Sequence, residues 1–343
     1  MRAEAADMGP EAATFIDSAA SALSGGKRLR ARFALAGWRA VAHHATPGRT
    51  PDDAIVSACA SLEVFHAAAL VHDDIIDNSD TRRGNPAAHR ALEAVHRSAA
   101  WAGDAASFGR SSAILLGDLL VAWSDDLLEE GLATVEVATA ARARREYALM
   151  RRDVTIGQFL DIAEESAFVS EPDERHAQRA LRVASYKSAR YSVQQPLLIG
   201  AALAGADDAQ LAALRDFGHP VGLAFQLRDD VLGVFGDETL TGKPSGDDLR
   251  EGKRTVLVAL AREHLPASAR RVVDELIGDP TLDENQIGAL QRTIVDSKAL
   301  ERVEDMIADY AREADRALAG ARLDNAAVGE LRDLARAATA RTS

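Results

Sequence analysis

Helical periodicity is the feature of this sequence that most limits its fold. Apolar side chains recur every three or four positions along the 343 residues, and the helix-favouring residues alanine, leucine, arginine and glutamate dominate. Long valine, isoleucine and threonine runs bounded by turns, which would indicate strands, are missing. Helices are predicted over residues 11–23, 30–44, 52–77, 86–96, 104–129, 132–165, 172–204, 207–232, 253–263, 266–277, 284–296, 298–319 and 325–341. The sequence therefore predicts an all-α protein.

Turn signals separate the predicted helices without dividing the chain. They are Thr46-Pro47-Gly48, Asn85-Pro86, Glu171-Pro172-Asp173 and Gly278-Asp279-Pro280. Pro196 lies inside a helical pattern and should kink or break it, because proline lacks a backbone N–H. We find no linker and expect a single domain over residues 1–343. The polar, glycine-rich segment near 236–254 is predicted to be a mobile flap over a site; the alternative is a plain surface loop.

The charge balance argues against some classes of protein. The formal net charge is −13, whereas a general nucleic-acid binder should be basic. The single cysteine, Cys59, cannot form an internal disulfide, which fits a reducing cytoplasm. The N-terminus has no basic-then-apolar signal layout, and the most apolar stretch, residues 112–128, carries three aspartates. We therefore expect a cytoplasmic protein with no nucleic-acid partner and no stable membrane insertion.

A first acidic cluster ends an apolar helical stretch. Asp73 and Asp77 are four residues apart and share one helical face, with Asp74 beside them. Two such carboxylates at 4 Å would repel by roughly 1 kcal/mol in water and about 4 kcal/mol in a partly shielded site. A cation between them removes this cost, and an all-oxygen site open to water and phosphate suits Mg²⁺. The alternative interpretation is a solvated acidic face.

A second acidic cluster has the same design. Asp229 and Asp230 end another apolar helical stretch, preceded by Gln226. Two matching helices suggest two walls of one deep central cavity, each holding metal at its rim. If Asp73 and Asp229 lay far apart and faced away from any shared cavity, this interpretation would fail.

Basic residues accompany both acidic clusters. Arginine and lysine are the usual partners of phosphate oxygens, so cations beside two metal sites suit two diphosphates. Each pair taken alone is more often solvated surface. The basic residues are Lys27, Arg28, Arg30, Arg82, Arg83, Lys243, Lys253 and Arg254.

These motifs, in this order, resemble those of the trans-isoprenyl diphosphate synthases, the polyprenyl synthetase family. The resemblance runs from Gly25 to the C-terminal helices, and residues 225–255 look most like bacterial members that make geranylgeranyl diphosphate. It rests on the acidic and basic clusters above together with His66, residues 157–161, Lys187-Ser188 and Phe225-Gln226. The family implies a helical bundle around a deep cavity, usually a homodimer, that uses three Mg²⁺ ions with bound diphosphate. The substrates would be isopentenyl diphosphate and an allylic diphosphate.

The resemblance also implies residue roles. Lys27, Arg30, His66 and Arg83 would hold isopentenyl diphosphate. Arg82, Lys187, Lys253 and Lys243 would hold the allylic diphosphate. Asp73, Asp77 and Asp229 would ligate Mg²⁺, supported by Asp74 and Asp230, while Ser188 and Gln226 would line the site where positive charge develops. Three positions depart from the family pattern: Gly233 replaces a third aspartate, Ala31 a proline and Ser188 a threonine.

The helix that ends at Asp73 is expected to set product length. One helical turn of about 5.4 Å is close to one isoprene unit. Ala68 and Ala69 are small, so Phe65 is the first bulky candidate for a floor, which predicts a C20 product. The alternatives are that Phe65 only packs in the core, and that the product is C15, or C25 and longer.

Two further functions remain open. A class I terpene cyclase also uses an aspartate-rich helix in an all-helical fold, but usually with a second motif of the Asn/Asp-x-x-Ser-x-x-x-Glu kind. A non-catalytic partner subunit typically loses the aspartates that this chain keeps.

Overall fold

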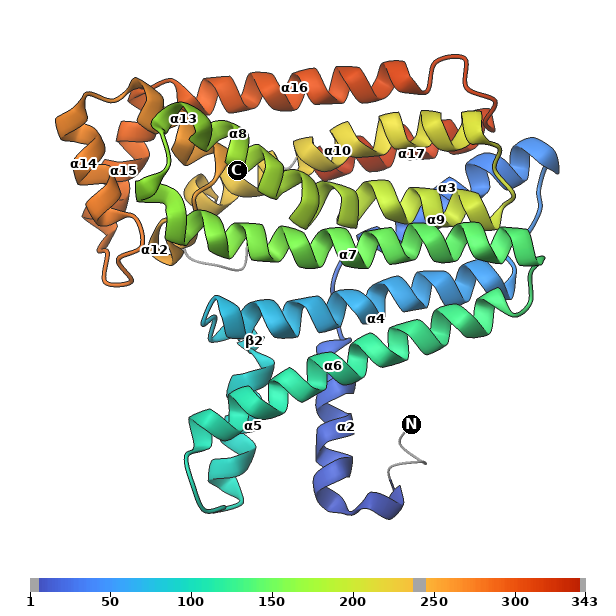
Figure 1. Ribbon diagram of the computed structural model, residues 1–343, viewed down its shortest axis with the longest axis horizontal. Coiled ribbons are helices and arrows are strands. Elements are labelled where there is room, and N and C mark those ends of the chain that lie inside the picture. The colour runs from blue at the N-terminus through green and yellow to red at the C-terminus, as the bar shows by residue number, and fades with distance from the viewer. Residues whose placement is uncertain (1–5, 237–244, 340–343) are drawn as a thin grey trace. The chain divides into compact units, whose positions relative to one another are not determined.

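Helices make up most of the part of the chain that the structure describes. We describe residues 6–236 and 245–339 of a computed structural model. Figure 1 shows the helices as long, mostly straight rods, and the predicted all-α class is confirmed. Of the expected loop near 236–254, the structure describes Gly236 and residues 245–254, in which Asp247–Glu251 form a short helix, and Lys243 lies outside the described residues.

Contacts between residues divide the chain into two compact units. The first comprises Met1–Arg32 and Pro51–Val135, and the second Phe33–Thr50 and Glu136–Ser343. Helix α3 (Leu29–Ala45) contributes its first turn to the first unit and the remainder to the second. The single domain expected from the sequence stays a prediction.

The first unit is built on two long helices packed along each other, α4 (Asp53–Ile76) and α6 (Ala105–Leu132). Besides the start of α3, its other elements are η1 (Ala6–Met8), α2 (Pro10–Ala22), β1 (Thr81–Arg82), β2 (Asn85–Pro86) and α5 (Ala88–Ser98). Figure 1 shows α4 running beside α6, and Ser61 of α4 donates a hydrogen bond to the Ser124 carbonyl of α6 at 2.7 Å. At Gly117 of α6 a side chain would collide with the ring of His72, so glycine permits this close packing.

A small hairpin in the first unit departs from the sequence expectation. Thr81 pairs with Pro86 and Arg82 with Asn85 in antiparallel register. The turn residues Arg83 and Gly84 both have positive φ, 54° and 74°, as two-residue hairpin turns require. Strands this short leave no periodic signal, so the sequence indicated only a turn at Asn85-Pro86 and began the next helix too early.

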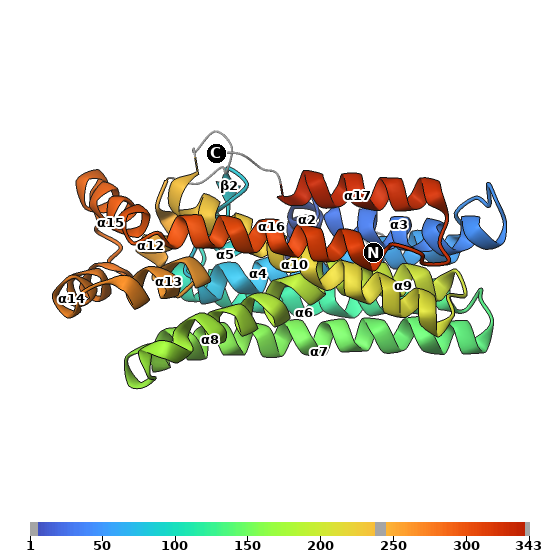
Figure 2. The ribbon, with the colours of Figure 1, turned by 90° about the horizontal axis from the view of Figure 1, so that it is seen from above.

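The second unit is a larger helical bundle. Its elements after α3 are α7 (Val137–Ala167), η2 (Phe168–Ser170), η3 (Asp173–Arg175), α8 (His176–Val183), η4 (Ala184–Gln194), α9 (Gln195–Leu203), α10 (Asp208–Phe235), α12 (Asp247–Glu251), α13 (Val256–His264), α14 (Ala267–Leu276), α15 (Glu284–Asp296), α16 (Ala299–Ala317) and α17 (Asn325–Thr339). Figure 2 shows α16 and α17 along one side of this unit and α7 along the other. Helix α9 is buried throughout, and at Gly200 a side chain would collide with the Ala34 carbonyl of α3.

The element before Pro196 has an unusual form. Residues Ala184–Gln194 form a π-helix, and the α-helical pattern resumes at Gln195 with Pro196 in the first turn of α9. The proline was expected to kink or break the helix, and the change of helix type occurs at this point. Because π-helices are rare and concentrate at functional sites, this segment is a candidate for a functional role.

Two helices have the length and composition of a membrane span. They are α4 and α6, with 56% and 28% of the apolar window buried, respectively. Core helices of soluble proteins meet the same criterion, and this signal by itself is weak. The absence of membrane insertion stays a prediction.

Candidate functional site

The first acidic cluster lies where α4 ends. Asp77 caps the helix, and its backbone N–H donates to the Asp73 carbonyl at 2.8 Å. Asp74 is 2% exposed and accepts a hydrogen bond from Arg82 Nε at 2.8 Å, while Arg82 Nη2 lies 3.6 Å from Asp73 Oδ2. Burial raises the pKa of Asp74, and the bound Arg82 partly offsets this shift. The hairpin thus returns a cation to the end of the helix that carries the carboxylates.

Arginines gather around His66 in the same unit. The pKa of His66 lies well below 6.5, first because the ring is desolvated and then because Arg30, Arg83, Arg82 and Arg28 repel a positive charge there. His66 is therefore neutral near pH 7. The structure brings His66, Arg30, Arg82 and Arg83 together, and a cluster of this kind attracts anions. The resemblance assigned His66, Arg30 and Arg83 to isopentenyl diphosphate and Arg82 to the allylic diphosphate, and these roles stay predictions.

Backbone geometry holds two of these arginines in place. Arg28 and Arg83 both have positive φ, 51° and 54°, a conformation that costs energy for residues other than glycine. Arg83 Nη1 donates to the Ser24 carbonyl at 2.8 Å, and its guanidinium lies against Gly26, where a Cβ would come within 2.8 Å of Nη2. The glycine pair before Lys27 therefore makes room for an arginine from the hairpin. Lys27 itself is exposed.

Glu63 is a residue of this cluster that the sequence reasoning missed. Its carboxylate accepts from the Ala31 N–H at 3.1 Å and lies 3.5 Å from Arg28 Nη1. Glu63 precedes His66 by three residues on α4, so the helical spacing could have indicated it. It fixes the start of α3 relative to α4 within the first unit.

The predicted chain-length residues occupy different environments. Phe65 is 6% exposed, Ala68 is fully buried in the core formed with α2, α5 and α6, and Ala69 is partly buried. Their roles stay predictions.

The second acidic cluster lies near the end of α10. Gln226 Nε2 donates to Asp230 Oδ1 at 2.7 Å, and Asp230 is 6% exposed. Burial raises the pKa of Asp230 to about 8, aided by the carboxylates of Asp248 and Asp229 and opposed by the Gln226 hydrogen bond. Near pH 7 the Asp230 carboxyl is therefore mostly protonated unless a cation arrives. Asp229 remains partly exposed beside it.

Asp248 is a second residue that the sequence reasoning missed. A Cβ at Gly233 would collide with the Asp248 carboxylate, which comes from α12. Lys253 Nζ contacts Asp248 Oδ1 at 3.1 Å and Glu251 Oε2 at 2.5 Å. A carboxylate from another element thus fills the space beside Gly233, and the sequence could not indicate this because the two residues lie on different helices, α10 and α12, outside any one helical period.

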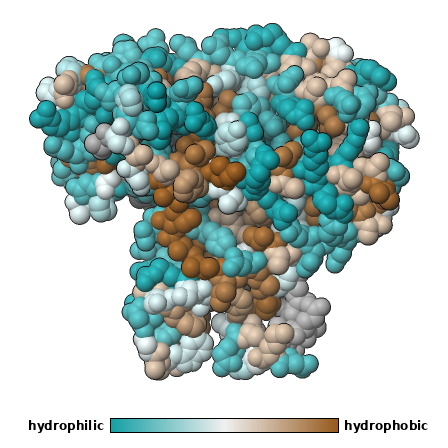
Figure 3. All heavy atoms as spheres, in the orientation of Figure 1, coloured by the Kyte–Doolittle hydropathy of each residue, from teal (hydrophilic) through white to brown (hydrophobic). Residues whose placement is uncertain are grey.

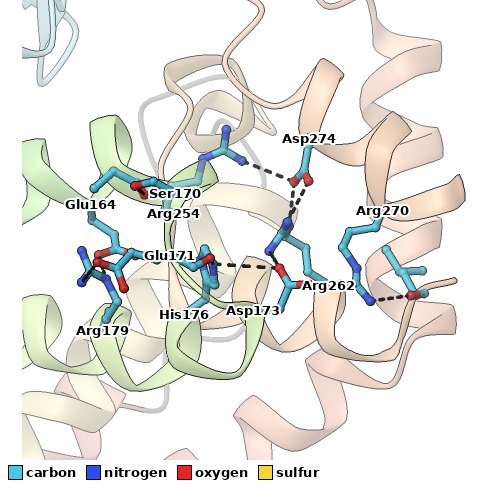
Figure 4. Close-up of polar contacts among 12 residues, drawn as sticks. Glu164, Ser170, Glu171, Asp173, His176, Arg179, Arg254, Arg262, Arg270 and Asp274 are labelled. Carbon is cyan, nitrogen blue, oxygen red and sulfur yellow. Dashed lines mark hydrogen bonds and ion pairs between the residues drawn. The ribbon is translucent and has the colours of Figure 1, made fainter. Parts of the chain in front are cut away.

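Lys253 and Arg254 are neighbours with different environments. Arg254 lies over the Phe168 ring at 4.3 Å, and its Nη1 is 4.0 Å from Asp274 (Figure 4). The cluster in Figure 4 also contains Arg262, which binds Asp274 through Nε at 2.6 Å and Nη2 at 2.7 Å. Arg254 therefore belongs to a structural ion network, whereas Lys253 stays with the acidic residues near α10.

Lys187 and Ser188 both lie in the π-helix η4. Lys187 Nζ contacts Asp161 Oδ2 of α7 at 2.5 Å. At Gly157, one turn earlier on α7, a Cβ would lie 2.7 Å from the Lys187 Cα. The motif at residues 157–161 therefore supplies both the close approach and the partner carboxylate for Lys187.

The predicted metal ligands are carboxylates, which suit Mg²⁺ in chemistry. Among the residues that the structure describes, no three histidine, cysteine or acidic side chains are arranged to hold a metal ion. Asp73 belongs to the first unit and Asp229 to the second, so their predicted meeting at one cavity stays a prediction. Asp74 and Asp230 have protein partners, Arg82 and Gln226, and their supporting roles stay predictions.

Replacing Asp230 with asparagine tests its raised pKa. The pKa is about 8 in the folded protein against 3.8 for an ordinary aspartate, so raising the pH ionises the unfolded chain first and destabilises the fold. With a metal chelator present, the free energy of unfolding should fall between about pH 5 and about pH 7.5 more steeply in the wild type than in Asp230→Asn. The difference in slope should be up to about 1.4 kcal/mol per pH unit. Urea unfolding at several pH values measures this, and parallel pH dependences would contradict the shift.

Comparison with known proteins places this geometry in a family. Residues 13–294 match the model of the polyprenyl synthetase family. A crystal structure of geranylgeranyl pyrophosphate synthase from Corynebacterium glutamicum, complexed with isoprenyl diphosphate and magnesium, is similar with a TM-score of 0.91 and 38% identity, covering 98% of this chain and 93% of that one.

Two curated relatives extend the comparison. Geranylgeranyl diphosphate synthase of Sulfolobus acidocaldarius is 33% identical over 67% of this chain, and the match spans only 63% of that relative. Geranylfarnesyl diphosphate synthase of Aeropyrum pernix is 32% identical over 85% of this chain and 82% of the relative. With the paired acidic helices and the arginine cluster described above, these matches show that the chain belongs to the polyprenyl synthetase family.

Proposed function

We propose that the protein is a Mg²⁺-dependent prenyltransferase that condenses an allylic diphosphate with isopentenyl diphosphate to give a longer all-trans prenyl diphosphate. In this reaction the allylic C–O bond breaks, a C–C bond forms to isopentenyl diphosphate, and diphosphate and a proton leave. The observation that carries the proposal is the neutral His66 among Arg30, Arg82 and Arg83, beside the carboxylates that end α4.

The arginine cluster of the first unit would bind isopentenyl diphosphate. Arg30 and Arg83 lie close enough to His66 to repel a positive charge on its ring, and Lys27 is exposed close by in the chain. His66 stays neutral, so it can donate one hydrogen bond to a phosphate oxygen without a second charge having to be buried. Fixed donors of this kind orient the diphosphate before reaction.

The leaving diphosphate would be held mainly by Lys187 and Lys253, with Arg82 and Lys243. Lys187 and Lys253 are now paired with Asp161 and with Asp248 and Glu251, which keeps both cations in place. Mg²⁺ held by Asp73, Asp77 and Asp229 would supply further positive charge to the diphosphate. Ser188 and Gln226 would present their polar atoms to developing positive charge, and the released diphosphate is the proposed proton acceptor.

We propose geranylgeranyl diphosphate, C20, as the product. The relatives include synthases named for geranylgeranyl and for geranylfarnesyl products, so longer chains are the alternative. Phe65 supports C20 because it is a bulky, buried side chain two turns from Asp73 on α4.

A homodimer in the cytoplasm is the proposed state of the enzyme. Helix α6 exposes Ile114 and Leu115, and α7 exposes Ile156, Phe159 and Ile162. Figure 3 shows apolar side chains, in brown, exposed at the surface of the first unit. Exposed apolar side chains of this kind favour burial against a second copy.

A class I terpene cyclase is the main rival. The second acidic cluster of this chain, with Gly233 packed against Asp248, differs from the Asn/Asp-x-x-Ser-x-x-x-Glu pattern of such cyclases. A non-catalytic subunit is less well supported, because Asp73, Asp77 and Asp229 are all present.

Purified protein incubated with Mg²⁺, isopentenyl diphosphate and C5, C10 or C15 starters should form longer allylic diphosphates, resolved by chromatography after dephosphorylation. Asp73→Asn should lower kcat by at least about a hundredfold, since it removes charge from the leaving-group site. Hydrocarbon as the sole product would favour the cyclase, and no turnover by the protein alone would favour the partner subunit.

The variant Phe65→Ala should shift the products beyond C20, because removing the ring lengthens the space along α4. Product chain length by mass spectrometry is the measurement, with Val64→Ala as a neighbouring control of smaller change. An unchanged distribution would assign Phe65 to core packing alone.

Lys253→Gln and Arg254→Gln should separate binding from stability. The first should raise the KM of the allylic diphosphate about tenfold, the cost of losing one charged hydrogen bond. The second should lower the thermal unfolding midpoint by several degrees, at nearly unchanged KM, because Arg254 lies over Phe168 and near Asp274. Equal effects of the two changes on KM would contradict this assignment.

A further inference from the structure

The π-helix η4 needs support from its neighbours to keep its register. Its wider turn packs and hydrogen-bonds less favourably than an α-helix, so an isolated segment would return to the α form. Lys187 and Ser188 lie in its first half. A return to α-helical register would rotate both side chains about the helix axis. Whatever stabilises the π form therefore decides where they point.

Close packing against glycines supplies part of this support. A Cβ at Gly222 of α10 would lie 2.5 Å from the Ala189 carbonyl oxygen, and one at Gly218 would lie 2.9 Å from Gln194 Cα. With Gly157 of α7, these glycines let two helices approach the η4 backbone. Such contacts limit the distance between helices. Because packing contacts depend little on orientation, they fix the rotation of η4 about its axis only weakly.

A side-chain hydrogen bond, which depends strongly on orientation, can fix the rotation of η4. Ser185 lies on η4, two residues before Lys187, and its Oγ is 2.8 Å from Nε2 of His219 on α10. The pKa of His219 is lowered, mainly by burial and further by Arg190, so the ring is neutral, and its tautomer decides whether Nε2 accepts the hydrogen bond from the hydroxyl or donates it. Arg190, also on η4, donates to Asp153 Oδ2 of α7 at 2.9 Å and lies over the Tyr186 ring at 4.1 Å.

We propose that His219 is a positioning residue, which holds η4 in π register through Ser185 and so orients Lys187 and Ser188. The inference rests on the proposed function, in which those two residues act on the allylic diphosphate. His219 itself touches neither substrate in this scheme. Its ring belongs to the lining of a cavity of about 430 Å³ that also includes Arg190, Gln194 and Glu313.

The cavity makes the proposal testable by substitution. Because His219 borders open space, leucine can replace it without forcing the core to repack. His219→Leu removes the hydrogen-bonding partner of Ser185, and His219→Gln keeps a polar group able to reach Ser185. Ser185→Ala removes the other partner with a smaller change, and tests the same bond should the leucine variant fold poorly. Glu313→Gln, an exposed change on the same cavity, is the matched control.

Steady-state kinetics should show a specific pattern. His219→Leu and Ser185→Ala should each lower kcat about tenfold, with the KM of isopentenyl diphosphate unchanged, since that substrate is assigned to the arginine cluster. The double variant should be no worse than either single one, because both remove the same bond. His219→Gln should recover most of the activity, and Glu313→Gln should match the wild type. Additive losses, or equal losses in the glutamine and leucine variants, would overturn the proposal.

Hydrogen exchange separates this inference from the proposed function. Backbone amides of residues 184–194 should exchange faster in His219→Leu and Ser185→Ala than in the wild type or Glu313→Gln, while α13 stays unchanged. Unchanged exchange in η4 would contradict the positioning role of His219, whatever the activity of the enzyme. A wild type that makes no prenyl diphosphate would contradict the proposed function. The exchange data would still decide whether His219 holds η4 in the π-helical form.

Discussion

Charge brought into apolar surroundings is the constraint on which the rest of this structure depends. Asp74 and Asp230 are almost fully buried near the ends of apolar helices, and burial raises the pKa of both. Burial lowers the pKa of His66, and the nearby Arg30, Arg83 and Arg82 lower it further. Like charges are costly at such sites, and partners of opposite charge offset that cost. Diphosphates and Mg²⁺ are the partners that the family's chemistry would bring.

Glycines decide where several of the charged groups can lie. Gly26 makes room for the guanidinium of Arg83, Gly157 for the backbone at Lys187, and Gly233 for the carboxylate of Asp248. In each case the glycine and its neighbour come from different segments of the same unit. The departure at Gly233 thus has a structural reason, because an aspartate there would compete with Asp248 for the same space.

The helices and the acidic clusters could be predicted, because both depend on residues near one another in the chain. Periodicity indicated α4 and α10, and the spacing of Asp73 and Asp77 indicated one helical face. The structural role of Arg254 could not be predicted, since Lys253 beside it has the same charge and a different environment. The contact between Asp248 and Gly233 could not be predicted from the sequence either, because it joins residues of two different helices.

The sequence by itself determined the all-helical class, the family and the chemical types of the site residues, because these follow from local periodicity and from motifs of fixed spacing. Tertiary structure alone decided which cation joins which carboxylate, that residues 184–194 form a π-helix, and that His219 contacts Ser185. Helix register and ion pairing of this kind depend on packing between distant segments, and no local pattern of residues records that packing.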